Sequence, residues 1–373
     1  MPIIGARGEN MNPPELRIGD LICKTPIVQG GMGVGISMSG LASAVANQGG
    51  IGVLSAAMPG FLEPGAASHM RAANIRGLRN EISKARRLSD GVLGVNIMVA
   101  LTNFADMVEV SVEEGIDIIF AGAGMPLSLP EYLPAHSKTK LAPIVSSGRA
   151  AMLICKKWLS RYERLPDAVV VEGPMAGGHL GFKAEQLDDP AYVLERLVPE
   201  VIAAVAPFEK EQGRAIPVIA AGGIYTGADI YRYLKMGAAG VQLGTRFVAT
   251  DECDAAPAFK NMFVAAAEKD IVVINSPVGM PGRAIRNPFL DAVKTGDRIP
   301  LKCPYHCIRT CDPEKSPYCI ALALANARKG KFAYGFAFAG QNAHRVDKIV
   351  PVKALMDELM HEYWVAVRNK RPN

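Results

Sequence analysis

Short runs of β-branched and other apolar residues recur along this chain, separated by longer stretches in which apolar and polar residues alternate at helical spacing. Short apolar runs are typical of strands that are buried on both faces of a parallel sheet. The stretches between them predict helices, for example over residues 104–114, 149–160 and 227–236. The predicted strands are Pro26–Gln29, Ile51–Ala56, Gly94–Met98, Asp117–Phe120, Ala142–Ser146, Ala168–Glu172, Ile216–Ala220 and Gly240–Leu243.

Eight strand–helix units favour an α/β fold of the TIM (β/α)8 barrel type over a doubly wound sheet, because right-handed crossovers can close eight parallel strands. With 373 residues and 49% hydrophobic content, the chain can bury one large core, and two small domains are the alternative. The periodicity of the barrel ends near residue 285. We therefore expect a barrel over 18–285 and a C-terminal lid with a helical extension over 286–373, packed on the barrel.

Charge and composition argue against several classes of partner. The net charge of +5 is spread over the chain without a block of like charge, so we expect no nucleic-acid partner. No run of about 18 apolar residues is present, and residues 1–10 lack a basic segment followed by an apolar one. We expect a cytoplasmic protein without a membrane partner. Cys23, Cys155 and Cys253 lie singly in or beside apolar or helical segments, which suits reduced thiols.

Each predicted strand ends in small or polar residues, as in the glycine-rich segments 30–33, 122–124 and 177–181. These ends lie together at the C-terminal face of a barrel, where the loops after the seventh and eighth strands commonly bind a phosphate through backbone N–H groups. Residues 220–224 and 242–247 occupy those two positions. Either glycine motif alone is also typical of a simple turn, and the two together favour a phosphate site.

The sixth predicted strand leads into a glycine-rich turn that carries His179. A lone histidine is often a polar surface residue, but this one follows a buried strand, where α/β proteins keep their chemistry. Gly177, Gly178 and Gly181 allow a tight turn and a close approach of the backbone to a ligand. His179 is therefore our candidate catalytic residue.

Taken in order, these motifs resemble the FMN-dependent nitronate monooxygenase family, formerly called 2-nitropropane dioxygenases, which includes flavin enoyl-ACP reductases. The resemblance covers about residues 18–285, nearly the whole of the predicted barrel. The motifs that carry it are Pro26–Met32, Gly94–Asn96, Ala176–Gly181, Ala221–Ile224 and Gly244–Phe247.

The resemblance implies an FMN over the barrel mouth, with its ring against the first strand and its phosphate on the last two loops. His179 matches the family's catalytic histidine, which acts as an acid or base beside the flavin. A homodimer is a family-level expectation, and the resemblance implies no metal at this site. The cofactor-binding residues that it implies are Gly30, Gly31, Met32, Asn96, Glu172, Gly177, Gly178, Gly222, Gly223, Gln242, Gly244 and Thr245.

The motifs do not separate the branches of the family. One branch oxidises alkyl nitronates with O2; in another, NADH or NADPH reduces the flavin, and an enoyl thioester or a quinone accepts the hydride. We place nitronate oxidation first, on the breadth of the family. Ser146 and Ser147 stand where some monooxygenases have a lysine, which favours a reductase. Met175 stands where many members carry an acidic residue, so the resemblance leaves substrate contacts there open.

Two other classes are less favoured. A flavin-binding accessory subunit without activity would not need His179. A purine-nucleotide dehydrogenase, which shares a similar barrel, would need a nucleophilic cysteine in the loop after the sixth strand, and residues 173–181 contain none.

The segment after the barrel is rich in cysteine. Cys303, Cys307, Cys311 and Cys319 lie within 17 residues, but their spacing matches neither the usual zinc sites nor a ferredoxin motif. We expect a reduced loop that packs over the barrel mouth and leads into a helix over 318–328, with a metal site or a redox-sensing disulfide as alternatives. Further on, Gln341 and Asn342 are candidates for contact with substrate or flavin, with helix capping and packing as the alternative. Residues 352–367 predict an amphipathic helix.

Overall fold

The computed structural model describes residues 14–64, 69–297, 303 and 305–369. Residues 1–10, where we expect no targeting segment, and residues 302 and 304 of the cysteine-rich segment lie outside the described residues. No helix in the described ranges has the length and apolar content that crossing a membrane requires.

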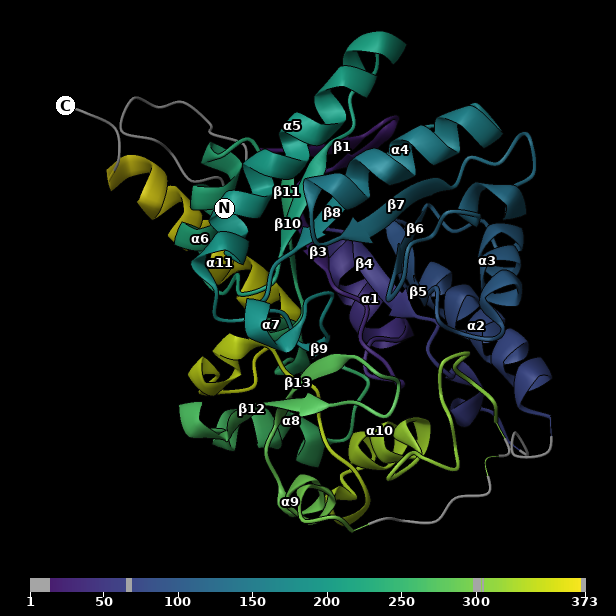
Figure 1. Ribbon diagram of the computed structural model, residues 1–373. Helices are drawn as coiled ribbons and strands as arrows, with labels where there is room; N and C mark the ends of the chain where they lie inside the picture. Colours follow the sequence, from purple (N-terminus) through teal and green to yellow (C-terminus); the bar gives the residue numbers. More distant parts are fainter. Residues whose placement is uncertain (1–13, 65–68, 298–302, 304, 370–373) are drawn as a thin grey trace.

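Eight parallel strands form the centre of the molecule, as the sequence predicts (Figure 1). Their order is β3-β11-β10-β8-β7-β6-β5-β4, and a parallel bridge between Val28 and Ile51 brings the first strand beside the last. The result is a nearly closed barrel of the TIM type. Its strands are β3 (Ile27–Gln29), β4 (Gly52–Ser55), β5 (Leu93–Met98), β6 (Ile118–Gly122), β7 (Lys140–Val145), β8 (Val169–Glu172), β10 (Val218–Ala221) and β11 (Gly240–Leu243).

The barrel interior is filled with side chains. Phe120, Val170 and Ile219 are fully buried there, in one cluster with Leu16 and Ile18 of the N-terminal hairpin. That hairpin consists of two antiparallel strands, and its apolar side chains close the N-terminal end of the barrel. The open end is therefore the C-terminal one. The hairpin strands are β1 (Leu16–Ile18) and β2 (Leu21–Cys23).

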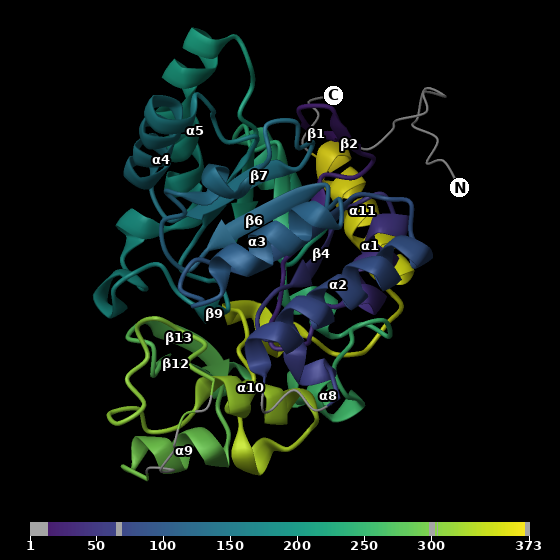
Figure 2. The same ribbon diagram turned by 90° about the vertical axis from the view of Figure 1, so that its right-hand side faces the viewer.

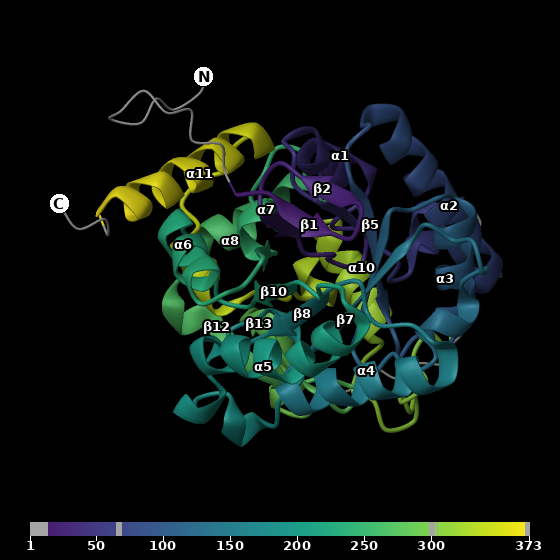
Figure 3. The same cartoon turned by 90° about the horizontal axis from the view of Figure 1, so that it is seen from above.

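Amphipathic helices surround the barrel, as the view down its axis shows (Figure 3). The last helix, α11, packs beside α6 and near α1, so the C-terminus of the chain supplies part of the helical layer. The contact is close because Gly227 has no side chain, and its N–H donates to Glu362 Oε2 at 2.7 Å. These helices are α1 (Ser39–Asn47), α2 (Met70–Leu88), α3 (Phe104–Glu113), α4 (Gly148–Tyr162), α5 (Leu194–Gln212), α6 (Gly227–Lys235), α7 (Thr245–Val248) and α11 (Val352–Asn369).

The described residues between α7 and α11, together with residues 178–179, form a cap over the C-terminal end of the barrel (Figure 2). The cap contains a three-stranded antiparallel sheet in the order β12-β13-β9, and Phe289, Tyr318 and Phe336 belong to an apolar cluster that the cap shares with Val34 and Met58 of the barrel loops. The division at residue 285 stays a prediction. The cap elements are β9 (Gly178–His179), β12 (Ile271–Asn275), β13 (Pro281–Ile285), α8 (Pro257–Ala265), α9 (Pro288–Lys294) and α10 (Ile320–Arg328).

Short 3-10 helices connect several of these elements. They are η1 (Pro59–Leu62), η3 (Leu129–Tyr132), η4 (Ala184–Gln186), η5 (Pro190–Tyr192), η6 (Glu268–Asp270), η7 (Phe332–Tyr334) and η8 (Gln341–Arg345).

Candidate functional site

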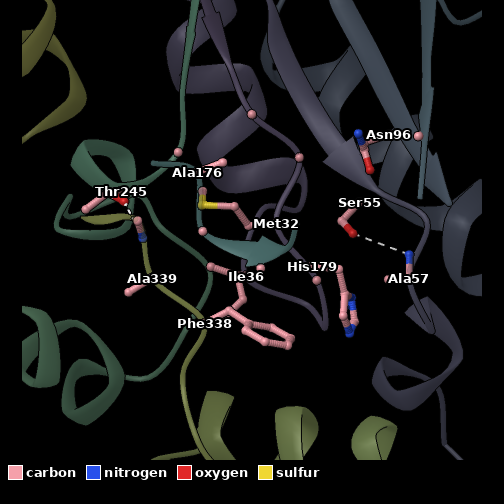
Figure 4. A pocket seen from close by; sticks show the side chains of 18 of the residues that line it. Met32, Ile36, Ser55, Ala57, Asn96, Ala176, His179, Thr245, Phe338 and Ala339 are labelled. Carbon is pink, nitrogen blue, oxygen red and sulfur yellow. Dashed lines mark hydrogen bonds between the residues drawn. The ribbon is translucent and has the colours of Figure 1, made fainter. Parts of the chain in front are cut away.

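A cavity of about 290 Å³ lies between the barrel mouth and the cap. Its floor is formed by the strand ends and the loops that follow them, and its roof by β9, α10 and residues 338–342 (Figure 4). All thirteen residues that the sequence analysis selected line this cavity. They come from six different strands or strand ends, so the barrel brings together positions that lie more than 200 residues apart in the chain.

The segment after β3 crosses the barrel mouth, and two of its glycines leave no room for a side chain. A Cβ at Gly31 would lie 2.3 Å from Asn96 Cβ, and one at Gly33 would lie 2.5 Å from Ala57 Cβ, whereas one at Gly30 would make an ordinary contact with Gln242. Met32 follows, and its sulfur lies beside Gly244. These glycines leave a flat backbone surface that a planar group can approach closely.

The loops after β10 and β11 expose backbone rather than side chains. Gly222 and Gly223 have φ values of +92° and +87°, which favour glycine, and a Cβ at Gly222 would lie 2.8 Å from Gly173 O. Gly244 precedes α7, whose first residue is Thr245. Successive backbone N–H groups in such loops form an anion-binding surface without needing a lysine.

Three polar side chains point into the cavity from the strand ends. Glu172 ends β8, Asn96 lies in β5 and Gln242 lies in β11. No described residue hydrogen-bonds to any of these three side chains, although each lines the cavity. Burial raises the pKa of Glu172 to about 7. Polar groups of this kind, without protein partners, are suited to a polar ligand.

His179 lies on a strand of the cap, which corrects our prediction that it lies in a turn. Residues 178–179 form β9, which pairs with β13 so that His179 is opposite Gly282. Its imidazole contacts the ring of Phe338 edge to face, with centroids 5.0 Å apart, and both rings point away from Asn96 (Figure 4). Burial lowers the pKa of His179 to about 4, so the imidazole is neutral at pH 7.

Two residues of the β12–β13 hairpin hold the histidine segment in place, and sequence reasoning did not find them. Ser276 Oγ lies 2.7 Å from His179 Nε2. The buried Arg283 side chain donates from Nη1 to the carbonyl oxygens of Pro174, at 2.5 Å, and Ala176, at 2.7 Å. The alternating pattern of 271–285 could have indicated strands, but nothing local showed which strand they would pair with.

Residues 341 and 342 also line the cavity. Asn342 Nδ2 donates to Gly223 O at 2.6 Å, and Gly340 N donates to Thr245 Oγ1 at 3.1 Å. The C-terminal segment is therefore tied to both of the glycine loops after β10 and β11. Asn342 packs on the loop that carries Gly223 and hydrogen-bonds to it rather than capping a helix, and contact of residues 341 and 342 with a ligand stays a prediction.

The described part of the cysteine-rich segment packs against the barrel mouth, and its reduced state stays a prediction. All four of its cysteines are free, and Cys307 lines the cavity. Ile308 forms an antiparallel bridge with Leu101, and Thr102 N donates to Cys307 O at 3.1 Å. In the described parts of the chain, no three histidine, cysteine or acidic side chains are placed to hold a metal ion.

Comparisons with known proteins identify the family of this chain. The profile of the nitronate monooxygenase family matches residues 16–362. A probable nitronate monooxygenase of Bacillus subtilis is 27% identical, with 90% of this chain and 95% of that protein covered. The (3aS,4S,5R,7aS)-5-hydroxy-7a-methyl-1-oxo-octahydro-1H-indene-4-carboxyl-CoA dehydrogenase of Mycobacterium tuberculosis is 33% identical over 73% of this chain. The match spans 66% of that enzyme, just under two thirds of its length.

Solved structures of other proteins have the same fold as this chain. The chain is similar to FabK from Thermotoga maritima, with a TM-score of 0.70 and 30% identity, covering 92% of this chain and 94% of that one. A nitroalkane oxidase from Streptomyces ansochromogenes has the same fold, with a TM-score of 0.70 at 24% identity. On the family profile and these relatives, the chain belongs to the nitronate monooxygenase family.

Proposed function

We propose that this protein is an FMN-dependent nitronate monooxygenase, which oxidises alkyl nitronates with O2 and uses His179 beside the flavin. The observation that carries the proposal is the pairing of an exposed glycine backbone with a neutral, enclosed histidine in one cavity. The family profile supports the reaction class.

The residues present fit an FMN. The N–H groups around Gly222, Gly223 and Gly244 and the hydroxyl of Thr245 would hold the phosphate, because the loops leave no side chain in the way. The flat surface after β3 would lie against the ring. Asn96, Glu172 and Gln242 have free polar atoms to meet those of the cofactor. When bound, FMN supplies the electron transfer that amino-acid side chains lack.

His179 would act on the substrate rather than on the cofactor phosphate, since it lies on the cap side of the cavity. As a neutral imidazole, it can donate one hydrogen bond to a substrate oxygen or accept one proton from a carbon acid. The cap, with Phe338 beside the imidazole, limits the access of water to the same place.

An anaerobic visible spectrum of the flavin-loaded protein tests the proposal. Titration with a primary alkyl nitronate should bleach the flavin, and admission of O2 should restore its colour with consumption of the nitronate. A flavin that no nitronate reduces would contradict nitronate oxidation. A protein that binds FMN but turns over neither nitronates nor the substrates named below would be an accessory subunit.

The second candidate is an NADH- or NADPH-dependent reductase of enoyl thioesters or quinones. Ser146 and Ser147 favour it, and so does the similarity to FabK and to a carboxyl-CoA dehydrogenase. A parallel titration with NADH and NADPH separates the two candidates. Bleaching by a nicotinamide and reoxidation by an enoyl thioester would establish the reductase.

A further inference from the structure

Ser276 makes a short contact with the candidate catalytic histidine from outside the cavity. It lies directly after β12, in the turn of the β12–β13 hairpin, and it is 6% exposed. Its Oγ is 2.7 Å from His179 Nε2, whereas His179 Nδ1 hydrogen-bonds to no described residue. The backbone of Ser276 is fixed as well, because its N–H donates to Met280 O at 3.0 Å.

The surroundings of the hydroxyl decide which partner donates. Ser276 Oγ already accepts a hydrogen bond from Val278 N, at 3.5 Å. Among the described residues, His179 Nε2 is the acceptor within reach of the hydroxyl hydrogen. If Nε2 carried the proton instead, Oγ would receive two donors, and its own hydrogen would be buried without an acceptor, which is costly. The hydroxyl therefore donates to Nε2.

We propose that Ser276 is a positioning residue that keeps the His179 proton on Nδ1 and turns that N–H toward the substrate. A neutral imidazole has one protonated nitrogen, so a hydrogen bond accepted at Nε2 fixes the other tautomer. His179 then serves as a hydrogen-bond donor toward a substrate oxygen rather than as a base. This inference rests on the proposed role of His179 and specifies which ring nitrogen performs it.

Nitrogen NMR of the flavin-loaded protein, labelled with 15N in the histidine rings, tests the tautomer without turnover. The His179 signals are identified by their loss in His179→Gln. We expect a protonated Nδ1 and an unprotonated Nε2 in the wild type and in Ser276→Thr, which keeps the hydroxyl. In Ser276→Ala the two tautomers should mix. A wild-type His179 with the proton on Nε2, or a pattern that Ser276→Ala leaves unchanged, would overturn the inference.

Kinetics on the substrate identified by the titrations give a second readout. Ser276→Ala should lower kcat about tenfold, the effect of losing one neutral hydrogen bond, with KM nearly unchanged. Ser276→Thr should recover most of the loss. Thr310→Val is the matched control, because Thr310 Oγ1 donates to Val278 O in the same hairpin at 3.2 Å and does not contact His179.

The two proposals fail in different ways. A flavin that no nitronate reduces would overturn the proposed function, whatever the NMR shows. Full activity in His179→Gln would remove the histidine from the reaction and with it the positioning role of Ser276. Loss of activity in His179→Gln, together with full activity in Ser276→Ala, would leave the function intact and overturn the role of Ser276. Equal losses in Ser276→Ala, Ser276→Thr and Thr310→Val would make Ser276 a structural residue of the hairpin.

Discussion

The two sides of the cavity are built by different means. On the barrel side, parallel strands end in glycines, and the exposed groups are backbone N–H and C=O of residues such as Gly222 and Gly244. On the cap side, an antiparallel hairpin holds one side chain, His179, through a strand pairing and a hydrogen bond to Ser276. Backbone on a rigid barrel suits the binding of a cofactor, whereas a single oriented imidazole suits chemistry on a substrate.

This difference predicts that cofactor binding and turnover can be lost separately. Changes on the barrel side should release FMN, and changes on the cap side should leave FMN bound to an inactive enzyme. The four predictions below change one side of the cavity at a time, from the largest expected effect to the smallest.

His179→Ala should lower turnover about 100-fold or more, the usual contribution of a positioned acid or base, while FMN content stays at the wild-type level. The measurement is kcat with the reactive substrate, together with the flavin absorbance per chain. His136→Ala is the control, because His136 is an exposed histidine outside the cavity. Loss of FMN in His179→Ala would show that the cap side also contributes to cofactor binding, and would contradict the separation of the two sides.

Gly222→Val should weaken FMN binding about tenfold or more, because a side chain at φ +92° is strained and would meet Gly173 O at 2.8 Å. Equilibrium dialysis of FMN measures the effect. Gly213→Ala is the control: Gly213 also has a positive φ, +63°, but a Cβ there would meet nothing within 4 Å. Equal affinity in Gly222→Val and the wild type would place the phosphate elsewhere.

The contrast also explains what the sequence could and could not predict. All eight barrel strands follow from local signals, since apolar runs and the glycines after them are set by neighbouring residues. His179 follows from its place after a buried strand, whereas the twelve cofactor-binding residues come from the resemblance of the ordered motifs to a known family, and all thirteen line the cavity. Ser276 and Arg283 lie about 100 residues from His179 and Ala176, the residues they hold. The pairing between β9 and β13 depends on tertiary contacts between segments that are distant in the sequence. In addition, β9 has only two residues, too few to give a periodic signal.

The carboxyl of Glu172, which lines the cavity at the end of β8, leads to a prediction for the barrel side alone. Its pKa is about 7 in the fold against 4.5 ordinarily, so the folded protein keeps a proton that the unfolded chain has lost between those pH values. Its contribution to the free energy of unfolding should therefore fall as pH rises from about 4.5 to 7, on the order of 2 kcal/mol.

Urea unfolding of the flavin-free protein at pH 5 and pH 8 measures this loss, with Glu172→Gln as the comparison. The variant should lack it, and the difference between the two proteins should grow with pH. His179 acts in the opposite sense in both proteins, because its lowered pKa costs stability as pH falls from 6.5 to about 4. An equal pH dependence in both proteins would contradict the raised pKa of Glu172.

The cysteine-rich segment should give the smallest effect, although it belongs to the cap. Cys307 lines the cavity and belongs to an apolar cluster. Burial is the main cause that raises the pKa of its thiol to about 12. The thiol therefore stays protonated at pH 7, which makes it a poor metal ligand. We therefore expect less than one atom of zinc or iron per chain, and unchanged turnover after treatment with a chelator. Cys307→Ala should alter kcat by less than about threefold, since it removes one small apolar contact. A stoichiometric metal whose removal unfolds the cap would contradict this expectation. The cysteine-rich segment would then be a metal site that stabilises the cap, in addition to the barrel glycines and the hairpin that holds His179.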